Sequence, residues 1–420
     1  MPRLMFSQTV LFTTLGFVCQ NSLAVTEKEV VMSYADLAHV VYEDSLITAK
    51  TLHQQAKKLV EAPSAEHLEA AKDAWKAARV PYQQSEVFRF GNAVVDEWEG
   101  QLNAWPLDEG LIDYVDNSYQ GELGNPGATA NIIASQTLKI GAETINLQPL
   151  SGELLANLNE LGGSEANVAT GYHAIEFLLW GQDLNGTKAG AGSRPYTDFA
   201  KGEQCTHGNC DRRAEYLLAT TELLVKDLTY MVEQWTPDAT NNYRQTLLAL
   251  PTKEAMTRML FGMGSLALGE LAGERMKVAL EANSPEDEHD CFSDNTHYSH
   301  FYNAMGIKNV YLNEYQRIDG KLFNGDSLSE LIANKNNSLD QQLQHAFTTS
   351  QAKLQRIVDK AEAAQSPEKF DQLIAGGNKP GAKMINDAIQ ALVNETALLE
   401  QVARTLKIEN LNPDNADHNF

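Results

Sequence analysis

Positive charge is scarce in this sequence. Its 420 residues include 33 Lys and Arg against 56 Asp and Glu, which gives a formal net charge of -23 at pH 7. Nucleic acids and anionic lipid surfaces are themselves negative, so a chain of this charge is repelled by both. The composition therefore argues against a nucleic-acid partner, whereas a cation is a favourable ligand.

Long apolar runs are confined to the first residues. Residues 1–24 combine a basic residue, an apolar run that ends at Val18 and small residues before position 25, as a cleaved secretory signal does. We expect the mature chain to begin near Val25 and to be exported to the periplasm or the cell surface. Cys19 follows a valine, where a lipoprotein signal has Gly, Ala or Ser, so a lipid anchor is not expected. No later segment has ~18 or more uninterrupted apolar residues, so we expect no transmembrane segment.

Cysteine is also scarce. Three cysteines remain after signal cleavage: Cys205, Cys210 and Cys291. Cys205 and Cys210 flank a short loop and are close enough to pair in an oxidising compartment, which leaves Cys291 free or competing for a partner. A metal knuckle formed by Cys205, His207 and Cys210 is a weaker alternative.

Alternating strand patterns are hard to find, and helical periodicity is present almost throughout. The sequence therefore predicts an all-α fold of two helical bundles. A Gly-rich stretch near residue 195 divides them into an N-terminal bundle, residues 25–195, and a C-terminal bundle, residues 196–420. The expected helices cover residues 27–61, 65–90, 129–145, 165–180, 210–235, 239–282, 297–318, 327–363 and 382–407.

The segment GYHAIEFLLWG, residues 171–181, places an ionisable pair in an apolar helix. Residues three apart project from one face of a helix, so His173 and Glu176 can reach a common point. The pair can be half of a metal site or of a proton-transfer site. The alternative is a His–Glu hydrogen bond that satisfies two buried groups.

Two further segments do not fit a plain bundle. In WKAARVPYQQSEVFRFG, Pro81 is expected to kink a helix and to direct Glu86 toward a cleft, although Glu86 and Arg89 can equally form a salt bridge one turn apart. In WEGQLNAWPLDEGLIDYV, Asp108 lies in a long segment with no regular helical pattern. Long ordered segments of this kind are often functional.

Acidic residues also follow a helical stripe in the second half of the chain. Glu270 and Glu274 continue an apolar stripe and can face inward, or face solvent if the helix is rotated by one residue. The acidic run at residues 286–290 follows a proline and is expected to be a solvated loop. We expect no metal ligands in it.

These segments together resemble the imelysin family of exported bacterial proteins. The family signature GxHxxE reads GYHAIE here, and it is accompanied in order by WKAARVPYQQSEVFRFG, NAWPLDEGLIDYV, GSRPYTDF and DEHDCFSDNTH. The resemblance implies two helical bundles with the signature helix lining a cleft between them. Members are described either as peptidases or as components of iron uptake, and the pattern is most similar to the iron-regulated branch.

The first functional hypothesis is therefore an exported iron-binding protein of a bacterial iron-acquisition system, without catalysis. Imidazole and carboxylate ligands suit iron, and thiolate is not needed. The expected partners are the metal ion and an outer-membrane or periplasmic iron-transport component. The predicted metal ligands are His173, Glu176, Glu86 and Asp108, with His297 as an outside candidate.

Two alternatives belong to other classes. A zinc metallopeptidase could use His173 and Glu176 as ligands, but the chain has no HExxH motif and its general base is unassigned. Its third ligand would come from Glu86, Asp108, His297 or His300. A metal-free cleft that binds a peptide or a glycan is the minor alternative. Its surface would be formed by Tyr82, Trp98, Trp105 and Tyr172.

Overall fold

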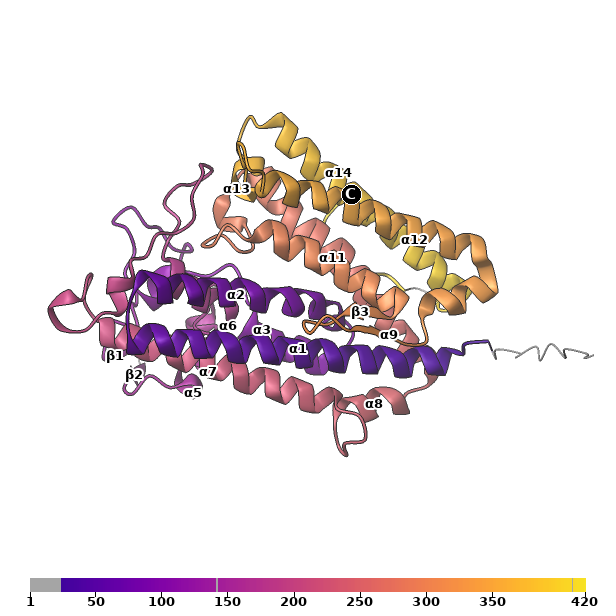
Figure 1. The fold of residues 1–420 in the computed structure, drawn as a ribbon, viewed down its shortest axis with the longest axis horizontal. Coiled ribbons are helices and arrows are strands. Elements are labelled where there is room, and N and C mark those ends of the chain that lie inside the picture. The colour runs from indigo at the N-terminus through magenta and orange to yellow at the C-terminus, as the bar shows by residue number, and fades with distance from the viewer. Residues whose placement is uncertain (1–23, 141–142, 410) are drawn as a thin grey trace, which may run out of the picture.

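The computed structural model describes residues 24–140, 143–409 and 411–420 and is mainly helical (Figure 1). The predicted signal peptide, with Cys19, lies outside the described residues except for its last position. Within the described ranges, no helix is long and apolar enough to cross a membrane. The all-α prediction is confirmed, with two short hairpins as additions.

The first bundle contains α1, α2, α6 and α7, which fill the lower part of Figure 1. α1 packs on α2 and α7, and α6 packs on α2 and α7. α1 begins after a capping box formed by Thr26 and Glu29, as its sequence favours. The main helices of this bundle are α1 (Glu27–Glu61), α2 (Ala65–Ser85), α6 (Gly171–Trp180) and α7 (Cys210–Trp235). Shorter elements are η1 (Glu86–Phe88), α3 (Ala93–Leu102), α4 (Glu109–Ile112), α5 (Gly152–Ala156) and α8 (Tyr243–Ala249).

The second bundle fills the upper part of Figure 1. Part of its core is a separate apolar cluster, which includes Leu271, Ile357, Phe370 and Leu392, and the rest is continuous with the apolar core of the first bundle. α12 packs on α11 and α14, and α14 also packs on the π-helix η5. The elements are α9 (Thr252–Ser265), η5 (Leu266–Val278), α10 (Ala279–Ala282), α11 (Thr296–Leu312), α12 (Leu328–Ala361), α13 (Phe370–Ile374) and α14 (Lys379–Thr405).

One predicted helix is wrong. Residues 129–145 instead contain strands β1 (Thr137–Ile140) and β2 (Glu143–Asn146), which pair antiparallel with Thr137 opposite Asn146. The segment is rich in Thr and Ile, whose branched Cβ atoms favour strands over helices. A second hairpin, β3 (Glu314–Gln316) with β4 (Leu322–Asn324), ends the predicted 297–318 helix early.

Two other helix boundaries differ from the prediction. The segment 239–282 is divided at Pro251, before which Leu250 is extended, and it continues as α9, η5 and α10. Residues in front of a proline disfavour the helical conformation, which explains the division. The signature helix begins at Gly171, not at residue 165. By contrast, α2 continues through Pro81 and ends four residues later.

The boundary at residues 195/196 remains a prediction, and the packing of α7 bears on it. α7 follows that boundary in sequence, yet it packs on α1 and α6 of the first bundle. The predicted disulfide between Cys205 and Cys210 is present at the start of α7, whose first residue is Cys210, with the two sulfurs 2.09 Å apart. Cys291 has a free thiol.

The two bundles meet where α2 packs on α11. At this crossing a Cβ on Gly306 would lie 2.5 Å from the carbonyl oxygen of Gln84, so only glycine allows the approach. Close backbone contact brings the buried polar side chains of α2 next to those that precede and begin α11. The candidate site lies at this junction.

Candidate metal centre between the bundles

The signature helix positions His173 and Glu176 in its first two turns. Gly171 has a φ of +84°, and a Cβ there would lie 2.3 Å from the carbonyl oxygen of Leu102, which explains the glycine. Both side chains are buried, and Nδ1 of His173 lies 3.1 Å from Oε2 of Glu176. The hydrogen bond expected from the i,i+3 spacing is therefore formed. Nε2 of His173 and Oε1 of Glu176 do not take part in it and can contact other groups.

The segment before α11 supplies those partners. Asp290 Oδ1 lies 4.0 Å from His173 Nδ1 and 3.8 Å from His289 Nδ1. The rings of His173 and His289 have centroids 4.9 Å apart. One ligand atom from each of these three residues lies within 4.8 Å of the others, which is a spacing that a metal ion can bridge.

The expectation of a solvated loop at residues 286–290 is wrong for its last three residues. Glu288, His289 and Asp290 are at most 1% exposed. The beginning of α11 holds this segment inward. Asp290 accepts hydrogen bonds from Asn295 and Ser299, and its own N–H donates to Thr296 Oγ1 at 2.9 Å.

Glu176 is tied to the same segment. Its Oε1 accepts a hydrogen bond from the backbone N–H of Ser293 at 2.9 Å and another from the Ser293 hydroxyl at 2.6 Å. The signature helix of the first bundle and the loop that leads into α11 are therefore joined through this carboxyl group.

Two buried arginines frame the centre. Arg79 Nη2 lies 2.7 Å from Asp290 Oδ1, and Arg275 pairs with Glu86 at 2.5 Å. Asn103 connects the two pairs, because it accepts from Arg79 and donates to Glu86 at 2.6 Å. Glu86 is thus connected to the centre through Asn103 and Arg79, and it has no direct contact with His173 among the described residues.

The Glu86–Arg89 salt bridge that the sequence allows is replaced by other pairs. Glu86 is used by Arg275, while Arg89 pairs with Asp96, Glu99 and Glu270. The π-helix η5 carries both Glu270 and Arg275, which pair with each other at 2.7 Å. Inward placement of Glu270 is therefore observed. Glu274, farther along the same helix, is about half exposed and pairs with His418 near the C-terminus.

The remaining predicted ligands have other partners. The Asp108 carboxylate accepts hydrogen bonds from Tyr119, Glu122 and Asn125 within the first bundle. His297 Nε2 lies 2.8 Å from the carboxylate of Glu362, the residue that follows α12. The structure therefore brings His173 and Glu176 together, adds His289 and Asp290, and places Asp108 and His297 in separate networks.

Burial controls the protonation of the imidazoles. Desolvation, together with the positive charge of Arg79, lowers the pKa of His173 to about 3. Desolvation and Arg275 hold the pKa of His289 well below its usual range. Both rings are therefore neutral at pH 7, which is the form that binds metal ions.

The two carboxyl groups at the centre differ in their protonation. Burial and the neighbouring charge of Asp290 hold the pKa of Glu176 well above its usual range. Burial also acts against the ionised form of Asp290, but Arg79, His173 and the hydrogen bonds from Ser299 and Asn295 together outweigh it and lower the pKa of Asp290 to about 2. At neutral pH the centre thus contains one permanent carboxylate beside two neutral imidazoles.

Several polar atoms here lack a protein partner. Nε2 of His173 and Nδ1 of His289 are buried and have no hydrogen bond within the described residues. Buried polar groups are nearly always paired in folded proteins, so such atoms need an explanation. A bound metal ion that accepts the lone pairs of these nitrogens is one explanation.

A cavity of about 380 Å³ between the bundles leads to this centre. His289, Asn103 and Arg275 lie on its wall, whereas His173 is not on the wall and lies behind His289. The other lining side chains are rich in carboxylates: Glu99, Glu160, Glu165, Glu270 and Glu274. An acidic approach of this kind concentrates cations near its opening.

Sequence reasoning missed His289, Asp290 and the two arginines. The signal available was the segment DEHDCFSDNTH, which contributed to the family resemblance but was interpreted as a solvated loop. Its mixture of His, Asp, Ser and Asn just before a helix is consistent with a buried polar junction. Helical periodicity alone carries no information on which distant partner it meets.

The fold and this buried histidine–carboxylate centre define a two-bundle helical protein with a polar junction between its halves. The family model described as imelysin, peptidase family M75, matches residues 38–399. The chain belongs to the imelysin family.

Individual relatives agree with this assignment. Iron-regulated protein A of Synechococcus elongatus is 26% identical over 359 residues, which cover 83% of this chain and 81% of the relative. The crystal structure of a protein from Parabacteroides distasonis, described as a putative iron-regulated protein A precursor, is 18% identical with a TM-score of 0.61, covering 92% of this chain and 97% of that one. An imelysin-like protein of Psychrobacter arcticum gives 17% identity and a TM-score of 0.61, with 92% and 98% coverage. These two structures support the fold.

Proposed function

We propose that this protein binds iron reversibly as an exported component of a bacterial iron-acquisition system and does not catalyse a reaction. The observation that carries the proposal is the group His173, His289 and Asp290, whose ligand atoms lie within 4.8 Å of one another. Glu176 supplies a further oxygen beside His173. The ion is the cargo of the protein.

The donor atoms suit this cargo. Two imidazole nitrogens with carboxylate oxygens form a mixed set of the kind that binds iron, and no thiolate takes part. The cavity that leads to the centre also favours a cation. Five carboxyl groups line it beside two arginines, Arg89 and Arg275.

The relatives support the same direction. The Synechococcus relative and the Parabacteroides protein both carry names that refer to iron regulation. Residues 1–24 have the pattern of a cleaved secretory signal, which supports an exported location in the periplasm or at the cell surface. We therefore propose an outer-membrane or periplasmic iron-transport component as the partner that receives the metal.

Direct measurement of metal content and affinity tests the proposal. The protein is purified without chelator, and iron binding is measured for the wild type and for His173→Ala, His289→Ala and His297→Ala. Removing a ligand typically lowers metal affinity far more than removing a bystander, so the first two variants should lose tight binding. His297→Ala is the matched control, because this histidine is also buried but pairs with Glu362.

Three outcomes would count against iron binding at this centre. Unchanged iron uptake in His173→Ala and His289→Ala, with a lower melting temperature, would make these residues a buried structural pair. A wild type that takes up no iron but cleaves casein in a chelator-sensitive manner would instead support the zinc metallopeptidase. Peptide or glycan binding that persists after metal removal would support the third alternative.

A further inference from the structure

A second cavity, which shares no lining residue with the metal centre, contains an arginine with an unused hydrogen-bonding edge. Arg194 follows the signature helix, and its backbone N–H donates to the carbonyl oxygen of Trp180 at 2.7 Å. Nη1 contacts Asp113 at 2.8 Å and Asp198 at 3.0 Å. The guanidinium lies between the rings of Tyr114 and Phe177, at 5.0 and 5.4 Å from their centroids. Its position is therefore rigidly held.

The other edge of this guanidinium has no acceptor. Nε and Nη2 of Arg194 are buried and have no hydrogen-bond partner within the described residues, although the side chain is only 1% exposed. These two nitrogens form one edge of the planar guanidinium, and their N–H bonds are parallel. That edge matches the two oxygens of a carboxylate.

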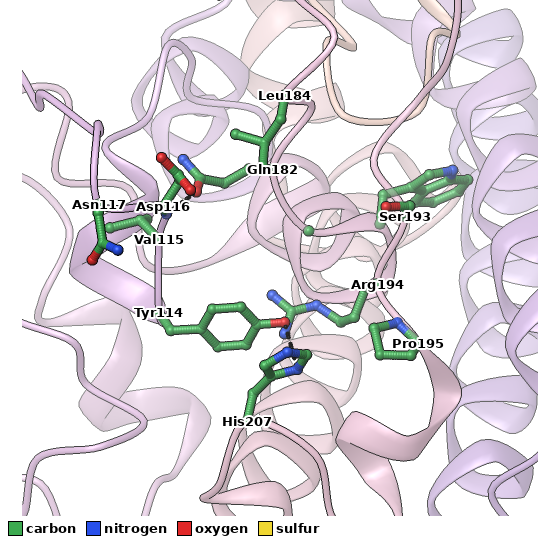
Figure 2. Close-up of a pocket in the computed structure, with 12 residues that line it drawn as sticks. Tyr114, Val115, Asp116, Asn117, Gln182, Leu184, Ser193, Arg194, Pro195 and His207 are labelled. Atoms are coloured by element: carbon green, nitrogen blue, oxygen red, sulfur yellow. Dashed lines mark hydrogen bonds between the residues drawn. The ribbon is translucent and has the colours of Figure 1, made fainter.

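The arginine lines a cavity of about 330 Å³. Figure 2 shows the guanidinium among Tyr114, His207 and Pro195, with Gln182 and Leu184 on the other side of the cavity. The lining combines polar groups with apolar surface from Trp180 and Leu184. Gly181 has a φ of +70° and presents no side chain beside Arg194, so it leaves room for a ligand next to the arginine.

The charges in contact with Arg194 balance one another, despite the negative charge of the whole chain. Asp116 also lines the cavity, but it lies away from the guanidinium in Figure 2 and accepts two hydrogen bonds from Ser118. Asp113 is paired with Arg213 at 2.6 Å as well as with Arg194, so two arginines balance Asp113 and Asp198. His207 adds a half-exposed ring, with Nδ1 2.7 Å from Asp198. The group formed by Arg194, Arg213, Asp113 and Asp198 is therefore neutral overall, and Nε and Nη2 of Arg194 are free to donate to a ligand carboxylate.

We propose that this cavity binds a small organic carboxylate. Nε and Nη2 of Arg194 donate to the two carboxylate oxygens, and the organic part of the ligand lies against Trp180 and Leu184. The cavity shares no lining residue with the metal centre. The carboxylate is therefore a second ligand of the protein, in addition to the metal ion proposed above. Arginine is suited to this role, because lysine has no planar pair of donors.

The test uses the full metal-free mature protein and three probes: acetate, succinate and benzoate, with benzamide as the neutral isostere of benzoate. Binding is measured by calorimetry and by the NMR signal of the Arg194 Nε–H. At least one carboxylate should bind and shift this signal, and benzamide should bind at least about tenfold more weakly than benzoate if benzoate is that ligand.

Two variants separate a site from a structural role. Arg194→Lys keeps a positive charge beside Asp113 but removes the bidentate edge, and it should weaken binding about tenfold or more. Leu184→Asp places a negative charge on an exposed wall residue without touching the partners of Arg194, and it should weaken binding while leaving the melting temperature unchanged. If Arg194→Lys fails to fold, Leu184→Asp and the Arg194 signal decide. Absence of binding by all three carboxylates, or binding that neither variant weakens, would overturn the proposal.

Discussion

Arg79 and Asp290 form a fully buried ion pair, with Nη2 2.7 Å from Oδ1, that joins α2 of the first bundle to the segment leading into α11. The two residues are 211 positions apart in sequence. Asp290 also belongs to the candidate metal group. The same contact therefore couples the packing of the two bundles to the geometry of the site.

Removing one member of this pair should be costly. Arg79→Ala leaves the Asp290 carboxylate buried without its main partner, and breaking a buried pair in this way typically destabilises a protein by about 3–5 kcal/mol. We expect a large drop in the melting temperature measured by circular dichroism. The exposed pair Arg404–Glu400 gives the control, since Arg404→Ala should change stability by less than about 1 kcal/mol. A small loss for Arg79→Ala would show that the junction is more hydrated than the structure indicates.

The glycine that begins the signature helix should be irreplaceable. Gly171→Ala introduces a Cβ that would lie 2.3 Å from the Leu102 carbonyl oxygen, at a φ of +84°. We expect a loss of more than about 1 kcal/mol in chemical denaturation, together with weaker iron binding, because His173 moves with the helix start. Gly100→Ala is the matched control. It lies within α3 with open space around a Cβ and should be neutral or stabilising.

The acidic lining of the large cavity should accelerate metal association. Glu160 and Glu165 are exposed carboxylates at this cavity. Glu160→Gln and Glu165→Gln should slow iron association several-fold at low ionic strength in stopped-flow measurements, with little change in the dissociation rate. The difference should disappear at high salt, because screening removes long-range attraction. An equal effect at all salt concentrations would indicate direct coordination by these residues.

Glu395 should make stability depend on pH. This carboxyl group lies between α12 and α14, where burial raises its pKa from 4.5 to about 8 and a hydrogen bond from Ser350 acts in the opposite direction. Between these two values the folded protein holds a proton that the unfolded chain releases. The free energy of unfolding therefore falls as the pH rises from about 4.5 to 8.

Glu395→Gln should remove this dependence. The variant should match the wild type near pH 5 and exceed its melting temperature increasingly toward pH 8. Glu400→Gln, on the exposed face of the same helix, should show no such trend. A melting-temperature difference that is the same at pH 5 and pH 8 would mean that Glu395 is ionised in the folded state.

The sequence predicted features that depend on neighbouring residues. The range of α1 follows from its apolar stripe and its capping box at Thr26, and the Cys205–Cys210 disulfide joins residues only five positions apart. His173 and Glu176 meet because residues three apart share a helix face. The helix predicted for residues 129–145 was wrong, because branched side chains at residues 137–146 favour a hairpin.

Only the tertiary structure decided which polar groups meet at the bundle junction. Glu86 could have paired with Arg89 within one turn, yet it pairs with Arg275, 189 residues away. His289 and Asp290 reach His173 only because α2 packs on α11 with glycine at the crossing. Periodicity determines the face on which a side chain lies, but the partner of a buried charge depends on which faces pack together, because desolvation favours the arrangement that pairs the most buried groups.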